Sequence, residues 1–371
     1  MIIALLLLVS MSAIADVNVN IATSTNAATI YLGSPSLVKL ANGHLVVSHN
    51  FSGPGAPTNG SGEWYRSEIY RSTDSGASWS SLGTVDDLYW ASLFVFGADL
   101  YAVGTTQQFG DLVIRKSTDE GDTWGANEVL DTTTYCTAPS RPVEIDGKLW
   151  FAYSISALGA FGDGDLKTAF VSTGDDIMDD TNWTFSSDLT MPAAWEGENW
   201  DGGFWTEPDL FSFGGEINIL SRIHSDPDTT GYAGLVAVNS TTGELTATSR
   251  VRLRGGDKRF YVNIQDNRAW TLTNPNIYPL GLVAQDESRN VLELYSSGDL
   301  VGWQRVARLI DGSALDHTQY GYQYVSWLFD GDDIIAAVRE ADASADNAHN
   351  SNLIEFYRFE DWEDRVGDAP L

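Results

Sequence analysis

Six times along this chain, a strand-like apolar run meets a tight polar turn and then resumes. The turns are Asn42-Gly43, Gly97-Ala98-Asp99, Asp146-Gly147, Gly214-Gly215, Asp266-Asn267 and Gly331-Asp332. Turn residues of this kind between runs of Val, Ile, Leu, Phe, Tyr and Trp are typical of β-hairpins. Their spacing of roughly 50 to 65 residues fits one four-stranded sheet per repeat. Because no long segment has a helical period, the sequence predicts an all-β, six-bladed β-propeller.

A second repeated motif, Ser-x-Asp-x-Gly-x-x-Trp, follows the first two hairpins. Residues 72–79 read Ser-Thr-Asp-Ser-Gly-Ala-Ser-Trp, and residues 117–124 read Ser-Thr-Asp-Glu-Gly-Asp-Thr-Trp. In such a turn the aspartate accepts hydrogen bonds from backbone amides, the glycine adopts a positive φ, and the tryptophan packs between neighbouring blades. We therefore expect Asp74 and Asp119 on peripheral turns with a structural role, away from any catalytic centre.

The chain is expected to form a single domain from Asp16 to Leu371, because no Pro-, Gly- or Ser-rich linker divides it. Before this domain, the apolar run from Ile2 to Val9 is followed by Ala13-Ile14-Ala15, which has the small-x-small form of a signal-peptidase site. The run is too short to span a bilayer. Residues 1–15 are thus predicted to be a signal peptide, and the protein a secreted monomer, extracellular or periplasmic.

The charge of the chain limits its partners. Its 21 Lys and Arg against 51 Asp and Glu give a formal net charge of -30. A field of this sign repels nucleic acids and anionic membranes, so neither is expected as a partner. An anionic substrate would have to be attracted by a local cluster of arginines, which makes the positions of the arginines informative.

The sequence contains no motif for a cofactor or a metal. Zinc-ligand spacing, a P-loop, a dinucleotide fingerprint and a Gly-x-Ser-x-Gly elbow are all missing from it. Cys136 is the single cysteine, which excludes an internal disulfide. We expect a protein without cofactor or metal, whose fold depends on its apolar core.

The two Ser-x-Asp-x-Gly-x-x-Trp turns within six repeated strand pairs resemble the Asp-box (BNR) repeats of the sialidase, or neuraminidase, superfamily. The resemblance covers nearly all of the chain after residue 15. It implies a sialidase-like propeller that acts on carbohydrate. Asp-boxes also occur in non-catalytic propellers, so the motif predicts the fold more strongly than the activity.

Single positions extend the resemblance to a site. In the fourth repeat, Glu207 begins one strand of a predicted hairpin and Arg222 ends its partner, as in sialidases, so both should lie at the same edge of the sheet. In the fifth, Thr273-Asn274-Pro275 followed by Arg289 resembles the Ser-Asn-Pro segment and a carboxylate-binding arginine of the family. A guanidinium suits this role because its planar fork binds a carboxylate bidentately. Arg141, in the third repeat, is a further candidate for substrate binding.

In the sixth repeat, Tyr324 begins the run Tyr-Val-Ser-Trp-Leu-Phe, which resembles the strand that carries the sialidase nucleophile. The resemblance implies that Tyr324 attacks the anomeric carbon while Glu207 takes its proton. A phenol, with an ordinary pKa of about 10, needs such a carboxylate base beside it. Tyr320 and Tyr322 are nearby alternatives.

The first repeat departs from the family. It reads Gly33-Ser34-Pro35 where sialidases have Arg-Ile-Pro, so the first arginine of the carboxylate-binding triad is missing. The catalytic aspartate of the following loop also has no clear match. His49, at the end of a predicted strand, and Glu63 are the candidates for acid and base, since a histidine pKa of about 6.5 suits proton transfer. Sialidase-like propellers that cleave rhamnose–glucuronate linkages resemble this layout in centring on a first-blade histidine.

Together these features predict a glycoside hydrolase of the sialidase-like type that releases a terminal acidic sugar from an extracellular glycan. One alternative is a polysaccharide lyase acting on a rhamnose–glucuronate type of polymer, in which His49 or Tyr324 abstracts the C5 proton of a uronate. The other is a non-catalytic propeller that binds glycans. A glycan or polysaccharide is the expected partner in all three.

Overall fold

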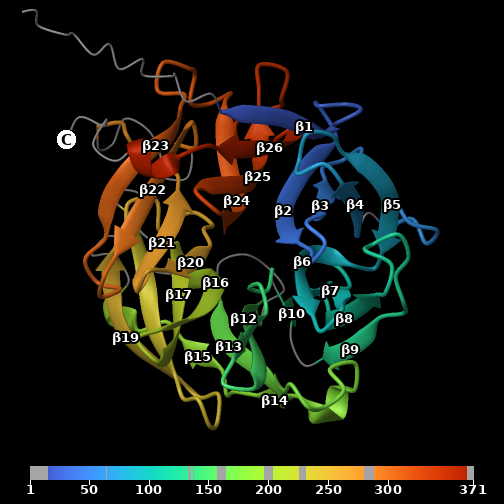
Figure 1. Ribbon diagram of the computed structural model, residues 1–371, viewed down its shortest axis with the longest axis vertical. Helices are drawn as coiled ribbons and strands as arrows, with labels where there is room; N and C mark the ends of the chain where they lie inside the picture. Colours follow the sequence, from blue (N-terminus) through green and yellow to red (C-terminus); the bar gives the residue numbers. More distant parts are fainter. Residues whose placement is uncertain are drawn as a thin grey trace, which may run out of the picture.

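The computed structural model of the protein describes residues 16–63, 65–132, 135–136, 138–156, 164–195, 204–224, 231–279 and 288–365. Its strands form six antiparallel sheets, which are arranged as blades around a common centre (Figure 1). This is the six-bladed β-propeller that the repeated hairpins predict. The predicted signal peptide lies outside the described residues.

In blades 1, 2, 4 and 5 the chain runs from the centre outward, one strand after another (Figure 1). Blade 1 has β2 (Tyr31–Lys39), β3 (Leu45–Ser52), β4 (Arg66–Ser72) and β5 (Ser80–Asp86); blade 2 has β6 (Tyr89–Phe96), β7 (Asp99–Thr105), β8 (Leu112–Ser117) and β9 (Glu128–Asp131). Blade 3 has β10 (Tyr135–Cys136), β11 (Val143–Ile145), β12 (Lys148–Ser156), β13 (Asp165–Ser172), β14 (Thr184–Phe185) and β15 (Leu189–Thr190). Blade 4 has β16 (Phe204–Phe213), β17 (Glu216–His224), β18 (Tyr232–Val238) and β19 (Leu245–Arg252); blade 5 has β20 (Val262–Gln265), β21 (Arg268–Thr273), β22 (Val291–Ser297) and β23 (Gln304–Asp311).

Blade 6 closes the ring with strands from both ends of the described chain. It contains β24 (Gly321–Asp330), β25 (Asp333–Ala341) and β26 (Leu353–Phe359), and its outermost strand is β1 (Val17–Thr23). β1 pairs antiparallel with β26, and Arg365 forms an ion pair with Asp16 next to it. Pairing the first strand with the last leaves the ring without a gap between blades, which protects strand edges.

The helical content of the described residues is three short turns: η1 (Asp180–Asn182), η2 (Ala193–Trp195) and η4 (Trp362–Arg365). Within the part of the chain that the structure covers, there is no helix of the length and apolarity that a membrane crossing requires.

A repeated hydrogen bond joins the innermost strands of neighbouring blades. The Ser326 hydroxyl accepts a bond of 2.9 Å from the Leu37 amide, and the Ser36 hydroxyl accepts one of 2.9 Å from the Leu93 amide. Asp209 accepts the equivalent bond in blade 4. These side chains are buried, so the bonds hold each inner strand at a defined height relative to the next. The residues two positions before these hydrogen-bonding side chains therefore lie at the same height along the axis of the central channel.

The Ser-x-Asp-x-Gly-x-x-Trp turns connect the third and fourth strands of blades 1 and 2, at the periphery. Asp74 accepts hydrogen bonds from the Ser78 amide and hydroxyl, of 2.9 and 2.6 Å. Gly76 has a φ of +95°, and a Cβ atom on it would lie 2.2 Å from the ring of Phe356 in blade 6. Trp79 packs against the same ring, with centroids 5.5 Å apart. These turns pack one blade against the next, as expected for a structural role.

Candidate active site

A cavity of about 430 Å³ opens at one end of the central channel. Ser34 of β2 lines this cavity, whereas Leu37 and Val38 of the same strand line a different cavity at the opposite end. The volume is in the usual range of small-molecule sites, about 300 to 1,000 Å³. We call this cavity the pocket; its lining residues are Gly33, Ser34, Asn50, Ser52, Tyr89, Trp90, Gln108, Ala138, Phe204, Thr206, Glu207, Arg222, His224, Arg289, Tyr324, Arg339 and His349.

Four inner strands reach the pocket with the same backbone irregularity. The pairing register of β2, β6, β16 and β24 with its neighbour shifts at one point in each strand. At each shift a residue other than glycine has a positive φ: Ser34 at 44°, Trp90 at 51°, Glu207 at 50° and Tyr324 at 53°. This backbone conformation is strained for such residues and is frequent at functional sites. All four line the pocket, so Glu207 and Tyr324 occupy equivalent places in blades 4 and 6.

Glu207 and Arg222 form an ion pair across the hairpin of β16 and β17. The Arg222 Nη1 atom lies 2.8 Å from the Glu207 Oε2 atom, and Arg222 Nε donates a bond of 2.7 Å to the Asp257 carbonyl. Lys258, which is fully buried, pairs with the Asp257 carboxylate at 2.8 Å behind them. Burial opposes the ionisation of Glu207, but the charges of Arg222, Arg259 and Arg289 and the hydrogen bond from Arg222 together outweigh it and lower the pKa of this carboxyl. Glu207 is therefore an ionised acceptor held in a fixed orientation.

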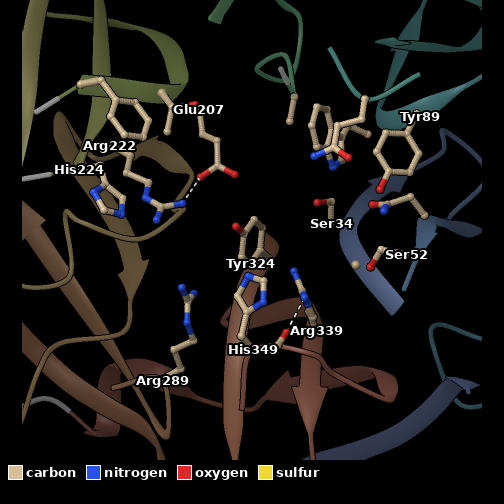
Figure 2. A pocket seen from close by; sticks show the side chains of 17 residues that line it. Ser34, Ser52, Tyr89, Glu207, Arg222, His224, Arg289, Tyr324, Arg339 and His349 are labelled. Atoms are coloured by element: carbon tan, nitrogen blue, oxygen red, sulfur yellow. Dashed lines mark hydrogen bonds and ion pairs between the residues drawn. The ribbon is translucent and has the colours of Figure 1, made fainter. Parts of the chain in front are cut away.

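Tyr324 lies between two guanidinium groups. The Arg339 Cζ atom is 4.9 Å from the centroid of its ring, and the Arg289 Cζ atom is 6.0 Å from it. Figure 2 shows Tyr324 in the middle of the pocket, with its hydroxyl directed to the side where Glu207 and Arg222 lie. Among the described residues, the Glu207 carboxylate has its hydrogen bond with Arg222, and no bond joins it to Tyr324.

A buried amide holds Arg289 and the Tyr324 strand together. The Asn274 side chain donates hydrogen bonds to the carbonyls of Val291, at 2.8 Å, and Tyr322, at 2.5 Å. The Tyr322 amide in turn donates to the Arg289 carbonyl at 2.8 Å. Asn274 thus sets the position of Arg289 relative to the strand that carries Tyr324 two residues further on.

Arg339 and His349 complete the cationic side of the pocket. Arg339 lies on β25 opposite Gln323, and it donates a hydrogen bond to the carbonyl of His349, in the connection between β25 and β26. The positive charge of Arg339, burial and the charge of Arg289 together lower the pKa of His349 to about 2. The His349 imidazole is therefore neutral at physiological pH.

No protein-family model matches the chain, and no curated protein matches its sequence. Solved structures do match. The α-L-arabinanase of Penicillium chrysogenum complexed with arabinobiose aligns over 92% of this chain and 98% of its own, with a TM-score of 0.57 and 14% identity. The GH93 α-L-arabinofuranosidase of Fusarium graminearum with arabinobiose aligns over 92% and 97%, with a TM-score of 0.59 and 14% identity.

A sialidase aligns as well. The Trypanosoma rangeli sialidase in complex with sialic acid aligns over 94% of this chain and 59% of its own, with a TM-score of 0.57 and 13% identity. The chain has the sialidase-like six-bladed propeller fold. At these identities the likeness establishes the fold of the protein, and the chemistry of the pocket has to be argued from its residues.

In this sialidase-like propeller, four of the predicted site residues come together although they are far apart in sequence. Glu207, Arg222, Arg289 and Tyr324 all line the pocket. Glu207 and Arg222 lie on β16 and β17 of blade 4, Arg289 just before β22 of blade 5, and Tyr324 on β24 of blade 6 (Figure 2). Their roles in catalysis remain predictions.

His49 does not line the pocket. Its side chain is fully buried within blade 1, where it stacks on Tyr70 with ring centroids 5.7 Å apart and has Nδ1 3.2 Å from the Asn50 carbonyl. The reason is the alternation of side chains along β3: Asn50 and Ser52 face the pocket, so His49 faces the other side of the sheet. Burial lowers the pKa of His49.

Glu63 and Arg141 also lie away from the pocket. Glu63 is exposed in the connection between β3 and β4, where its amide donates to the Asn59 side chain at 2.9 Å. Arg141 lines the cavity at the opposite end of the channel and donates to the Asn263 side chain at 3.0 Å. Ala138, three residues earlier, is the member of this segment that lines the pocket, because the inner strand runs down the channel from there.

Several pocket residues were not predicted from the sequence. They include Trp90, His224, Arg339 and His349. A comparison of the inner strands would have indicated Trp90, since Trp90-Ala91-Ser92-Leu93 repeats the pattern of Ser34-Pro35-Ser36-Leu37. Among the described residues, no group of three or more His, Cys, Asp or Glu could hold a metal ion.

Proposed function

We propose that the protein is a secreted glycoside hydrolase that releases a terminal acidic sugar from an extracellular glycan. The observation that carries this proposal is the composition of the pocket: in a chain of net charge -30, three arginines converge there with Tyr324 and Glu207. A cationic pocket in an acidic protein is the arrangement that selects an anionic ligand locally. The proposal includes export through residues 1–15 and a single, monomeric domain from residue 16 to residue 371.

The pocket supports a two-step displacement at the anomeric carbon. The Tyr324 oxygen would bond to this carbon while the glycosidic C–O bond breaks and the leaving oxygen takes up a proton from water in the open pocket. The Glu207 carboxylate, which is ionised, would accept the phenolic proton of Tyr324. Water would then cleave the bond between Tyr324 and the sugar and return the phenol. For the proton transfer Glu207 has to approach Tyr324 more closely than its bond with Arg222 now holds it.

The surroundings of Tyr324 favour this role. Guanidinium groups near the ring stabilise negative charge on the phenol oxygen when it gives up its proton. The carboxylate of the sugar would bind to the same guanidiniums, as arginine pairs with carboxylates through charge-assisted hydrogen bonds. The sugar carboxylate and the nucleophile would then lie side by side, which fixes the anomeric carbon near Tyr324.

The structural neighbours act on both neutral and acidic sugars. Two of them hold arabinobiose and one holds sialic acid. The arginines of this pocket favour the acidic class, because Arg339 is buried and forms no ion pair among the described residues, and a neutral sugar would leave it without a counter-charge.

The test is a screen of the purified protein against 4-methylumbelliferyl glycosides of N-acetylneuraminic acid, glucuronic acid and arabinofuranose, together with uronate-rich polysaccharides. We expect turnover of an acidic glycoside and a loss of kcat of about 10³-fold or more in Tyr324→Phe, which removes the nucleophile. Tyr320→Phe, on the same segment but outside the pocket, is the matched control and should retain kcat.

Other outcomes would contradict the proposal in distinct ways. An unsaturated uronate product, seen by its ultraviolet absorbance, would identify a lyase. Glycan binding that survives Tyr324→Phe, with no product from the wild-type protein, would identify a binding propeller. Turnover of the arabinofuranoside alone would show that the arginines do not select the substrate.

A further inference from the structure

We infer that Arg339, a residue of blade 6, binds the substrate carboxylate in place of the arginine that blade 1 lacks. This inference rests on the proposed function and assigns its specificity to a particular side chain. Arg339 and Arg289 would hold the carboxylate together, while Arg222 orients Glu207.

The first argument is the space around Gly33. A Cβ atom on Gly33 would lie 3.6 Å from Arg339 Nη1 and 3.4 Å from the side-chain amide of Asn50. The guanidinium of Arg339 thus lies against the backbone of blade 1, at the position from which a side chain is missing. Figure 2 shows Arg339 on the side of Tyr324 that faces Ser34, the neighbour of Gly33. The glycine leaves room for an arginine that arrives from the adjacent blade.

The second argument is that the hydrogen-bonding capacity of Arg339 is largely unused. Its side chain is 6% exposed, and one terminal nitrogen donates to the His349 carbonyl. Its Nε atom has no hydrogen-bond partner, and no carboxylate of the described residues forms an ion pair with it. A buried guanidinium without a counter-charge is costly, and an anionic ligand would offset that cost.

Arg222 differs from Arg339 in both respects. Its Nη1 atom is paired with the Glu207 carboxylate and its Nε atom with the Asp257 carbonyl. These bonds engage both edges of the guanidinium, so Arg222 acts on the reaction through Glu207. Arg222 is thus a positioning residue, which holds the Glu207 carboxylate in its orientation.

The third argument is the placement of Tyr324 between the two remaining arginines. Arg339 and Arg289 approach its ring from β25 and from the residues before β22, with Cζ atoms 4.9 and 6.0 Å from the centroid. A carboxylate bound by both would lie next to the Tyr324 hydroxyl. A sugar carboxylate held there, whether on the anomeric carbon as in N-acetylneuraminate or across the ring oxygen from it as in glucuronate, would keep the anomeric carbon near the phenol.

The experiment compares wild type, Arg339→Met, Gly33→Arg/Arg339→Met and Arg71→Gln. Arg71 pairs with Asp122 outside the pocket and serves as the matched control. The readout is the affinity, by calorimetry, for N-acetylneuraminate and for glucuronate, each against its methyl ester. We expect Arg339→Met to weaken binding of an acid by about 10- to 100-fold and to leave its ester unaffected. The double variant, which returns an arginine to blade 1, should recover part of this loss.

A second readout separates a loss of charge from a loss of structure. Arg339 is the main cause of the lowered pKa of His349, so Arg339→Met should raise the pKa of His349 from about 2, measured by NMR titration of its imidazole. This rise would show that the charge has been removed from a pocket that is still folded, so that a loss of acid binding alone can be assigned to the missing charge.

The inference is overturned if Arg339→Met weakens the acids and their esters alike, or if wild type binds neither acid. Acid binding that depends on Arg339, in a protein that turns over no acidic glycoside, would uphold the inference and reject the proposed hydrolase.

Discussion

Replacing Glu207 by glutamine removes the negative charge of the ion pair in the pocket and keeps the shape of the side chain. The side chains of Glu207 and Arg222 are 12% and 10% exposed, and their charged atoms lie 2.8 Å apart. In Glu207→Gln, Arg222 keeps its bond to the Asp257 carbonyl but loses its counter-charge. In Arg222→Met, Glu207 loses the counter-charge that Arg222 provides.

Removing one partner of a fully buried pair costs about 3–5 kcal/mol. Because this pair borders an open cavity, we expect each single change to lower the free energy of unfolding by about 2–3 kcal/mol. Both changes remove one shared interaction, so the double variant should lose about 1–2 kcal/mol less than the sum of the two.

The pH dependence has a definite sign. The folded-state pKa of Glu207 is lowered, since burial is outweighed by the neighbouring arginines together, Arg222 first among them. The stabilisation is therefore present above the unfolded-state pKa of about 4.3 and is lost as the pH falls through the lower folded-state value. The unfolding free energies of wild type and Glu207→Gln should converge in acid.

The assay is urea unfolding of the four proteins at pH 7 and at a series of lower pH values. Glu216→Gln, an exposed change on the same hairpin, is the control and should stay within about 0.5 kcal/mol of wild type. Strict additivity of the two single changes, or a Glu207→Gln difference that does not vary with pH, would refute the reasoning.

Two further predictions concern the blades. Gly76→Ala should lower the free energy of unfolding by about 2 kcal/mol or more, because it combines positive-φ strain with a clash against Phe356. Gly43→Ala is the control: Gly43 has a φ of +88° and no atom within 4 Å of an added Cβ, so this change should cost only the backbone strain, about 1–2 kcal/mol, in the same denaturation assay. Burial, partly offset by a hydrogen bond from Tyr357, raises the pKa of Glu340 to about 7. The stability that protonated Glu340 contributes is thus complete below a pH of about 4.3 and is lost as the pH rises to 7. Glu340→Gln should therefore reduce the pH dependence of the thermal unfolding temperature across that interval. An unchanged pH dependence would contradict this prediction.

The fold could be predicted because each blade repeats its local signals. A two- or three-residue turn between apolar runs determines a hairpin through local interactions alone, independently of residues far away in the sequence. The motif around Asp74 and that around Asp119 have the same hydrogen bonds because both have serine, aspartate and glycine at the same positions, followed by serine or threonine before the tryptophan. Six such units in one chain leave few arrangements other than a ring.

The site was harder to predict, because side-chain direction depends on details that the sequence does not display. At Glu207 and Tyr324 a bulge with positive φ turns the side chain into the pocket, and these positions were found through a family resemblance, since no propensity indicates a bulge at Glu or Tyr. His49 was predicted to lie at the pocket, but its neighbour Asn50 lines the pocket instead, because successive side chains of β3 face opposite sides of the sheet. Arg339 lies on a second strand, in a run that reads as ordinary β-structure, and only the ring brings it to blade 1.

The closure of the ring has a consequence for how the protein is made. Asn18 of β1 bonds to Tyr357 of β26 across 339 residues, so the earliest strand to be synthesised has to wait for the latest before it has a neighbour. Until then blade 6 has only β24 and β25 in place, and the ring is open. Because the two ends of the described chain meet at Asp16 and Arg365, a circular permutant that joins them and opens the chain between the last strand of one blade and the first strand of the next would keep all six sheets, and each of its strands would pair with a strand close to it in sequence. The order in which the blades are synthesised is thus separable from their arrangement in the finished ring.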